Sequence, residues 1–342
     1  MKLKTLKELA YDDINLIDRF IILGPSGIGK SEIIKSIARS HANKIGKKFI
    51  DLNEYVSEEI LHNPDKYFVY YRIIGPYFNY DLIEYPKVDA DKVKVIPNLT
   101  FLILQTCQGL LFVDEITNVS LPHVRTQLYA LLDSKEIGSH IKLQNIVIIA
   151  AGNRMEHSED AEGLPKPLRN RLCVLNVHPD FETWIEWYKN SEFYNPYISA
   201  FLYEKPELLY TEIDDDDGYR NFASPRTWTR LSSTLNKLGN KIPTDIVIGY
   251  VGPKIADMFV TYLKYNVDFA RLKEDVGYWE KLNRSQKVIA AMYIATKVDK
   301  DYQPLLEYVA KREPEFVKLV IATANEKSDI QVLTYISRLI SE

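Results

Sequence analysis

The 342-residue sequence predicts an α/β protein, in which a parallel sheet flanked by helices is followed by an all-α C-terminal region. In the first half, short apolar runs alternate with helical patterns, which is typical of a parallel sheet covered on both faces. After His178 strand-like runs become rare, and apolar residues recur at helical spacing instead. These two observations divide the chain into a sheet-containing half and a helical half.

The predicted strands are short and apolar on both faces, as buried parallel strands are. We expect them at Arg19–Leu23, Lys48–Leu52, Gly109–Val113, Ile146–Ala150 and Cys173–Val177. We expect helices at Lys30–Ala42, Pro122–Asp133 and Phe181–Lys189. Further on, Ser224 and Pro225 form a helix start, and apolar residues at helical spacing predict two more helices around 317–321 and 332–340.

The composition is that of an ordinary globular protein, with 46% hydrophobic and 26% charged residues. A net charge of −4 supplies no global attraction for nucleic acid, although a local basic pore stays open. Two distant cysteines, Cys107 and Cys173, form no disulfide framework or metal pattern. With no apolar signal core at the start and no apolar run of about 18 residues, we expect a cytoplasmic protein without a membrane span.

One acidic run, Asp214–Asp217, has two interpretations. Adjacent aspartates repel one another and usually lie in water, so we favour a solvated loop. A metal site is the alternative.

A glycine-rich segment follows the first predicted strand and leads into a helix. Residues 24–31 read GPSGIGKS and fit the pattern GxxxxGK[ST] in the context that confirms it. The glycines let backbone N–H groups surround phosphate oxygens at a helix N-terminus. We therefore expect ATP to bind there, with Lys30 on the β and γ phosphates and the Ser31 hydroxyl on Mg²⁺. The alternative is a glycine-rich turn without a ligand. The predicted nucleotide-binding residues are Gly24, Pro25, Ser26, Gly27, Ile28, Gly29, Lys30, Ser31 and Glu32.

The apolar strand that contains Leu110–Val113 ends in two acids, Asp114 and Glu115. Burying charge is costly unless it meets a metal or a partner, so paired acids at this point indicate a site. We expect Asp114 to hold Mg²⁺ and Glu115 to act as the general base that polarises the attacking water. The alternative is a strand that ends in two exposed acids.

Two further positions follow the same logic. Asn153 lies at the end of a buried strand, where ligands of parallel sheets bind, and is a candidate to contact the γ-phosphate or the water; the alternative is a turn cap. Arg169 and Arg171 end a short helix, and arginine is the cation best suited to transition-state phosphate charge. The alternative for them is to cap that helix.

The motifs in this order resemble the AAA+ superfamily and, within it, the MoxR-type ATPases of the helix-2-insert clade. The sequence LLFVDEITN at 110–118 is similar to that family's DEINRA block, and 150–153 with 164–172 to its AAGNP…LPEALLDRF block. The sequence FASPRTW at 222–228 is similar to its SPR motif in the helical lid. The resemblance covers about residues 15 to 265.

The resemblance implies roles for the matched positions. Asn153 corresponds to the sensor-1 residue, and Arg171 to the arginine finger that reaches a neighbouring subunit's ATP. Arg226 corresponds to the sensor-2 arginine of the lid, which contacts the nucleotide of its own subunit. Arg169 has no firm counterpart and is a second finger candidate.

The sequence departs from the family at two places. The residues after the two acids read Ile116-Thr117-Asn118-Val119, which changes the type of the polar pair. The stretch between Asp51 and Gly109 matches poorly and is rich in tyrosine, including Tyr67, Tyr70, Tyr71, Tyr77, Tyr80 and Tyr85. This stretch is a candidate for the insert that lines the ring. Its tyrosines either bind a partner chain in the pore or, as we favour, belong to the core or to subunit contacts.

The resemblance implies a nucleotide-binding domain at 1–178, a helical lid at 179–265 and a C-terminal helical extension at 266–342. It also implies ATP hydrolysis in a homo-hexameric ring that remodels a partner protein, with a von Willebrand A domain protein as the expected partner. A DNA motor or helicase loader, and a nucleotide-gated scaffold with little turnover, are the alternatives. The intact Glu115 speaks against the scaffold, because a scaffold needs no base.

Overall fold

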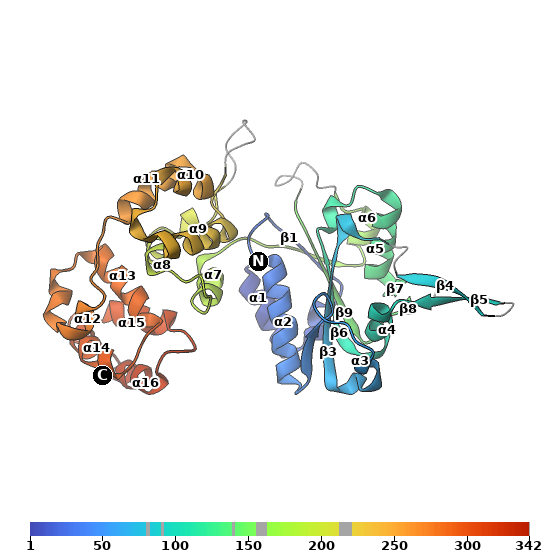
Figure 1. Ribbon diagram of the computed structural model, residues 1–342, viewed down its shortest axis with the longest axis horizontal. Helices are drawn as coiled ribbons and strands as arrows, with labels where there is room; N and C mark the ends of the chain where they lie inside the picture. Colours follow the sequence, from blue (N-terminus) through green and yellow to red (C-terminus); the bar gives the residue numbers. More distant parts are fainter. Residues whose placement is uncertain (80–82, 90–91, 139–140, 155–162, 212–220, 342) are drawn as a thin grey trace. The chain divides into compact units, whose positions relative to one another are not determined.

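The computed structural model describes residues 1–341 apart from 80–82, 90–91, 139–140, 155–162 and 212–220. The chain divides into two compact units, Met1–His178 and Pro179–Glu342 (Figure 1). The acidic run at 214–217 and Tyr80 lie outside the described residues.

The first unit is built on a six-stranded sheet in the order β10-β1-β9-β6-β3-β2. Every neighbouring pair in this sheet is parallel. The strands are β1 (Phe20–Leu23), β2 (Lys48–Asp51), β3 (Tyr67–Ile74), β6 (Gln108–Asp114), β9 (Ile146–Gly152) and β10 (Cys173–Asn176). The predicted α/β fold class is confirmed, and the five predicted strands are present with ends shifted by one or two residues.

The strand β3 is missing from the prediction. It lies between β6 and β2, with Ile74 opposite Asp114 and Tyr70 opposite Leu110. Tyr70 is buried, and Tyr67 and Tyr71 pack against the core under the sheet. For these three tyrosines the core interpretation is therefore confirmed, and the interpretation as a pore-lining grip is wrong.

Helices cover both faces of this sheet (Figure 1). One face is covered by α1 (Leu3–Asp12) and α2 (Lys30–Lys44), which pack on each other. The other face carries α4 (Leu99–Thr106) and α5 (Pro122–Ser134), whose apolar residues join Val69, Leu111 and Ile148 in one core. Short helices α3 (Glu59–His62) and α6 (Lys166–Arg169) complete the described helices of this unit.

Two small antiparallel hairpins lie outside the main sheet. The first pairs β4 (Glu84–Asp89) with β5 (Lys92–Pro97), directly before α4. The second pairs β7 (Glu136–Ile137) with β8 (Ile141–Lys142). The first hairpin is strongly exposed at Tyr85, Val88 and Val93.

The described part of the second unit is helical. Its helices are α7 (Phe181–Tyr188), α8 (Pro196–Glu204), α9 (Pro225–Leu238), α10 (Thr244–Val251), α11 (Pro253–Tyr262), α12 (Arg271–Glu274), α13 (Arg284–Ala295), α14 (Gln303–Ala310), α15 (Pro314–Thr323) and α16 (Ile330–Leu339). The predicted cap is present: Ser224 and Thr227 form a capping box, with Pro225 in the first turn of α9. One core runs from Trp184 to Ile336, so it crosses the boundary predicted at 265. The separation of a lid from an extension stays a prediction.

Among the described residues, no helix is long and apolar enough to cross a membrane.

Candidate nucleotide-binding site

The glycine-rich segment forms the turn between β1 and α2. Gly27 and Gly29 have φ angles of 78° and 94°, in the left-handed region that favours glycine. Gly24 is fixed for a different reason: a Cβ on it would lie 2.6 Å from the carbonyl oxygen of Val177. The turn ends at the first residues of α2, where backbone N–H groups lack partners within the helix. This is the local structure that binds phosphate groups in proteins.

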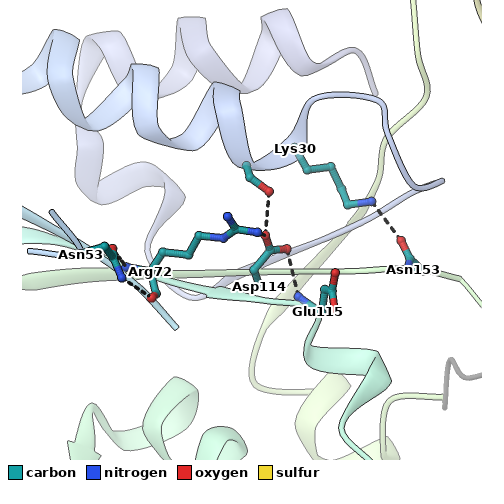
Figure 2. Close-up of polar contacts among 7 residues, drawn as sticks. Lys30, Asn53, Arg72, Asp114, Glu115 and Asn153 are labelled. Atoms are coloured by element: carbon teal, nitrogen blue, oxygen red, sulfur yellow. Dashed lines mark hydrogen bonds and ion pairs between the residues drawn. The ribbon is translucent and has the colours of Figure 1, made fainter. Parts of the chain in front are cut away.

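Lys30 starts α2 and is buried. Its Nζ donates to the carbonyl oxygens of Gly24 and Pro25, both at 2.7 Å, and to Asn153 Oδ1 at 3.2 Å. Figure 2 shows the ammonium group reaching from the helix towards Asn153 at the end of β9. The structure thus brings together the predicted phosphate-binding lysine and the predicted sensor-1 residue.

Asp114 ends β6 on the side of the sheet that faces α2, and it is buried. Its Oδ2 accepts a hydrogen bond of 2.6 Å from Ser31 Oγ, and its Oδ1 accepts the backbone N–H of Glu115 at 3.0 Å. The two residues predicted to hold Mg²⁺ are therefore in direct contact.

Glu115 follows with an exposed side chain and a left-handed backbone, at a φ of 55°. This conformation is uncommon for a residue with a Cβ, and such conformations cluster at functional sites. The turn gives the two adjacent acids different environments: Asp114 is buried beside Ser31 and Arg72 (Figure 2), and the Glu115 side chain is exposed.

Thr117 joins this turn to the neighbouring strand β9. Its buried Oγ1 accepts the backbone N–H of Asn153 at 2.9 Å and donates to Asn118 Oδ1 at 3.1 Å. A Cβ on Gly152 would lie 2.7 Å from the Thr117 side chain, so glycine permits the close approach. Thr117, which differs from the MoxR-type residue at this position, therefore positions Asn153.

We expect Thr117→Val to destabilise the first unit by about 1–3 kcal/mol, because valine keeps the shape but leaves the partly buried N–H of Asn153 without its acceptor. Urea unfolding measures this. The matched control is Thr126→Val on the exposed surface of α5, with an expected change within about 0.5 kcal/mol. Equal changes in the two variants would contradict the positioning role.

The two candidate finger arginines are both exposed. Arg171 forms an ion pair through Nη1 with Asp133 near the end of α5, and its side chain is 62% exposed. Arg169 ends α6. The predicted role of these two arginines as fingers stays a prediction.

Arg226 lies exposed in the first turn of α9, in the second unit. Its predicted sensor-2 role stays a prediction. Glu32 is an exposed residue in the first turn of α2, and Ile28 is buried beneath the loop.

Two residues of this site were missed by the sequence analysis: one lies in β3 and the other directly follows it. Arg72 donates through Nη2 to Asp114 Oδ2 at 2.5 Å. Gly75 follows the strand where a Cβ would lie 2.7 Å from Val119 and 3.2 Å from the carbonyl oxygens of Asp114 and Glu115. The signal that indicates them is the run FVYYRII at 68–74, which is as apolar and β-prone as the strands that were predicted.

The residues fit ATP with Mg²⁺. The left-handed glycines and the N-terminus of α2 suit phosphate oxygens, and Lys30 presents a buried cation to the same loop. The Ser31 hydroxyl and the Asp114 carboxylate supply the hard oxygen ligands that Mg²⁺ prefers, which usually adds phosphates and waters to one or two side chains.

Comparison with known proteins agrees with this geometry. Residues 20–174 match the model of the ATPase family associated with various cellular activities (AAA). The match is less than half of the chain, but it runs from β1 into β10 and contains Lys30, Asp114, Glu115 and Asn153. This part of the chain is similar to an AAA-type ATPase domain. No curated protein matches the chain.

Solved structures with a similar fold include AAA+ proteins. A mutant of RuvB from Thermotoga maritima is 16% identical, with a TM-score of 0.31, over 81% of this chain and 74% of that chain. AMPPCP-bound DnaA from Aquifex aeolicus is 13% identical, with a TM-score of 0.36, over 98% and 86% of the two chains. The ORC2 protein of Aeropyrum pernix is 11% identical, with a TM-score of 0.36, over 99% and 93%. Similarities at this level assign no substrate or partner to this chain.

Proposed function

We propose that the chain binds Mg²⁺·ATP and hydrolyses it to ADP and phosphate. The observation that carries the proposal is the meeting of Lys30, Ser31, Asp114, Glu115 and Asn153 at the carboxyl ends of β1, β6 and β9. Ser31 and Asp114 would hold Mg²⁺, which would supply charge neutralisation to the phosphates. Lys30 would bind the β and γ phosphates, Glu115 would accept the proton of the attacking water, and Asn153 would orient that water.

We further propose a MoxR-like ring, with six subunits, that remodels a partner protein. The exposed Arg171 would complete the site of the neighbouring subunit, so that turnover depends on assembly. By resemblance to the MoxR-type ATPases, a protein with a von Willebrand A domain is the proposed partner. Arg226 would couple the helical unit to the nucleotide.

The β4–β5 hairpin supports this assignment, because it precedes the helix that leads into β6, where the clade carries its insert. Val88 lies opposite Val93, and Pro86 opposite Val95, so these four residues share one face of the hairpin. The three valines are exposed. An exposed apolar face of this kind suits a surface that grips a polypeptide.

The decisive measurement is the solution mass of the Glu115→Gln variant with and without Mg²⁺·ATP. This variant keeps the metal and phosphate ligands but lacks the base, so we expect it to bind ATP, to lose turnover by about 100-fold or more, and to accumulate as an assembly of about six subunits. Light scattering coupled to size exclusion measures the mass.

The matched control is Glu8→Gln, which removes an exposed carboxylate of α1 and should hydrolyse ATP like the wild type. A monomeric Glu115→Gln variant in both conditions would contradict the ring. Undiminished turnover would contradict the assignment of Glu115 as the base.

One observation favours DNA as a second candidate for the substrate of the ring. Lys87 and Lys94 lie directly opposite each other on the second face of the hairpin, beside Tyr85. Two lysines on one face of the hairpin are side chains that can contact phosphate groups. Turnover that DNA stimulates at low salt and that salt suppresses would favour the DNA motor over the protein remodeller.

A further inference from the structure

Two donors share one oxygen of Asp114. The Ser31 hydroxyl donates to Oδ2 at 2.6 Å, and the Arg72 guanidinium donates to the same oxygen at 2.5 Å (Figure 2). The other oxygen, Oδ1, accepts the backbone N–H of Glu115. A carboxylate oxygen has two lone pairs, so both acceptor positions of Oδ2 are filled. One of the two donors is a full positive charge at the place where a metal would approach.

The backbone of Arg72 is held on both sides by one side chain. Asn53 donates through Nδ2 to the Arg72 carbonyl oxygen at 2.9 Å and accepts the Arg72 N–H through Oδ1 at 2.8 Å (Figure 2). The edge strand β2 ends at Asp51, and Asn53 continues its pairing to β3 through the side-chain amide. The position of Arg72 is therefore specified by the residues that follow β2.

One N–H group of the Arg72 guanidinium lacks a hydrogen-bond partner in the part of the chain that the structure describes. Nε of Arg72 is buried without a hydrogen-bond partner among the described residues, although the side chain as a whole is 37% exposed. Asp114 is far more buried, with a side chain 6% exposed. An unpaired buried donor is costly, so the charge of Asp114 is what keeps the guanidinium in place.

We propose that Arg72 is a positioning residue that competes with Mg²⁺ for Asp114 and so sets the Mg²⁺ concentration at which nucleotide binds tightly. The inference rests on the proposed Mg²⁺·ATP site. A hydroxyl can rotate and offer its lone pair to a metal, so Ser31 adapts to the cation. A guanidinium has no lone pair to offer and is repelled by the metal, so it has to leave Oδ2. The exposed part of the side chain gives it a route to solvent.

The experiment follows binding of the fluorescent analogue N-methylanthraniloyl-ATP over a series of Mg²⁺ concentrations at fixed nucleotide. Arg72→Gln removes the competing cation, so we expect the half-saturating Mg²⁺ concentration to fall about fivefold. Arg72→Lys keeps a positive charge that reaches Asp114 but lacks the planar guanidinium. Its half-saturating Mg²⁺ concentration should stay within about twofold of that of the wild type. Asn53→Ala loosens the arginine, and should lower the concentration by about twofold.

The matched control is Arg39→Gln, which removes one charge from the exposed surface of α2, where the guanidinium lies over the Phe49 ring. We expect its Mg²⁺ requirement to equal that of the wild type. A second readout needs no nucleotide: Mg²⁺ alone should raise the melting temperature of Arg72→Gln more than that of the wild type or of Arg39→Gln. A merely structural role of Arg72 would lower the melting temperature without changing its response to Mg²⁺.

The outcomes separate this inference from the proposed function. A wild-type chain that binds no nucleotide at any Mg²⁺ concentration overturns both. A wild type with Mg²⁺-dependent binding, and an Arg72→Gln variant with the same or a higher Mg²⁺ requirement, overturns only the competition. If Arg72→Gln does not fold, Asn53→Ala decides: an unchanged Mg²⁺ requirement overturns the competition, and a lowered one supports it.

Discussion

Lys30→Ala is expected to abolish ATP binding, with an affinity at least about 100-fold weaker than that of the wild type. The Lys30 ammonium is buried and already directed at the phosphate loop, where it contacts the carbonyl oxygens of Gly24 and Pro25. Each charge-assisted hydrogen bond to a phosphate contributes about 1.5–3 kcal/mol, and alanine removes those of the ammonium together. Isothermal calorimetry with Mg²⁺·ATP measures the change directly.

The control for this variant is Lys66→Ala, which removes an exposed lysine of the same unit and should bind ATP as the wild type does. Circular dichroism and melting temperature establish that the Lys30 variant is folded. An unchanged ATP affinity would show that the glycine-rich turn is not the phosphate-binding loop.

Arg171→Ala is expected to reduce ATP turnover by about 100-fold or more while ATP affinity stays within about twofold. An arginine supplied by a neighbouring subunit stabilises charge that develops only in the transition state, so its loss lowers turnover and spares ground-state binding. Steady-state hydrolysis and calorimetry on the same preparation separate the two quantities. Arg169→Ala is the comparison variant, since it removes the other candidate finger of the same segment: a loss of turnover in Arg169→Ala alone would assign the finger to Arg169.

Mixed assemblies test whether Arg171 acts across subunits. Glu115→Gln subunits keep the arginine but lack the base, and Arg171→Ala subunits keep the base but lack the arginine. If the arginine serves a neighbour, a mixture regains turnover that neither variant has alone. A mixture that stays inactive, or an Arg171→Ala variant with wild-type turnover, would remove Arg171 as the finger.

The ion pair of Arg171 with Asp133 bears on this result. Both residues belong to one subunit, and the arginine side chain is 62% exposed, so the pair is worth little and is easily exchanged for another anion. Loss of turnover in Arg171→Ala therefore reports on the new contact rather than on the loss of the pair.

Much of the fold follows from the sequence because the signals were local. The strand β6 and its two acids, the strand β9 and its asparagine, and the glycine-rich turn before α2 each carry a pattern that needs no knowledge of the rest of the chain. The cap of α9 is similar, because Ser224, Pro225 and Thr227 lie within four residues.

The features that the sequence analysis did not predict depend on pairings between residues distant in the chain. Tyr67–Ile74 has the composition of a strand, but its tyrosines also suit an exposed insert, and only its place between β6 and β2 decides. Arg72 is recognised as a site residue only with that strand, since the register places it opposite Phe112, two pairs before Asp114. The contact of Arg171 with Asp133 depends on how two helical segments pack, which no local pattern specifies.

The left-handed turn at Glu115 also lay beyond prediction. Glutamate has no preference for a positive φ, so the conformation is imposed by its surroundings. Gly75 lies close to Val119 and to the carbonyl oxygens of Asp114 and Glu115, and Thr117 is hydrogen-bonded to the backbone of Asn153, so neighbouring segments constrain the turn.

The closeness of Gly24 to Val177 has a consequence for how a signal leaves the phosphate loop. Val177 donates its N–H to Leu23 and lies with its carbonyl oxygen against Gly24, and the first unit ends one residue later, at His178. Because Val177 packs directly against Gly24, a shift of the loop on phosphate binding or release would displace the segment that connects the two units. If the proposed ATPase moves its second unit, that movement would begin at this segment, and inserting a few glycines after His178 would uncouple it from ATP hydrolysis.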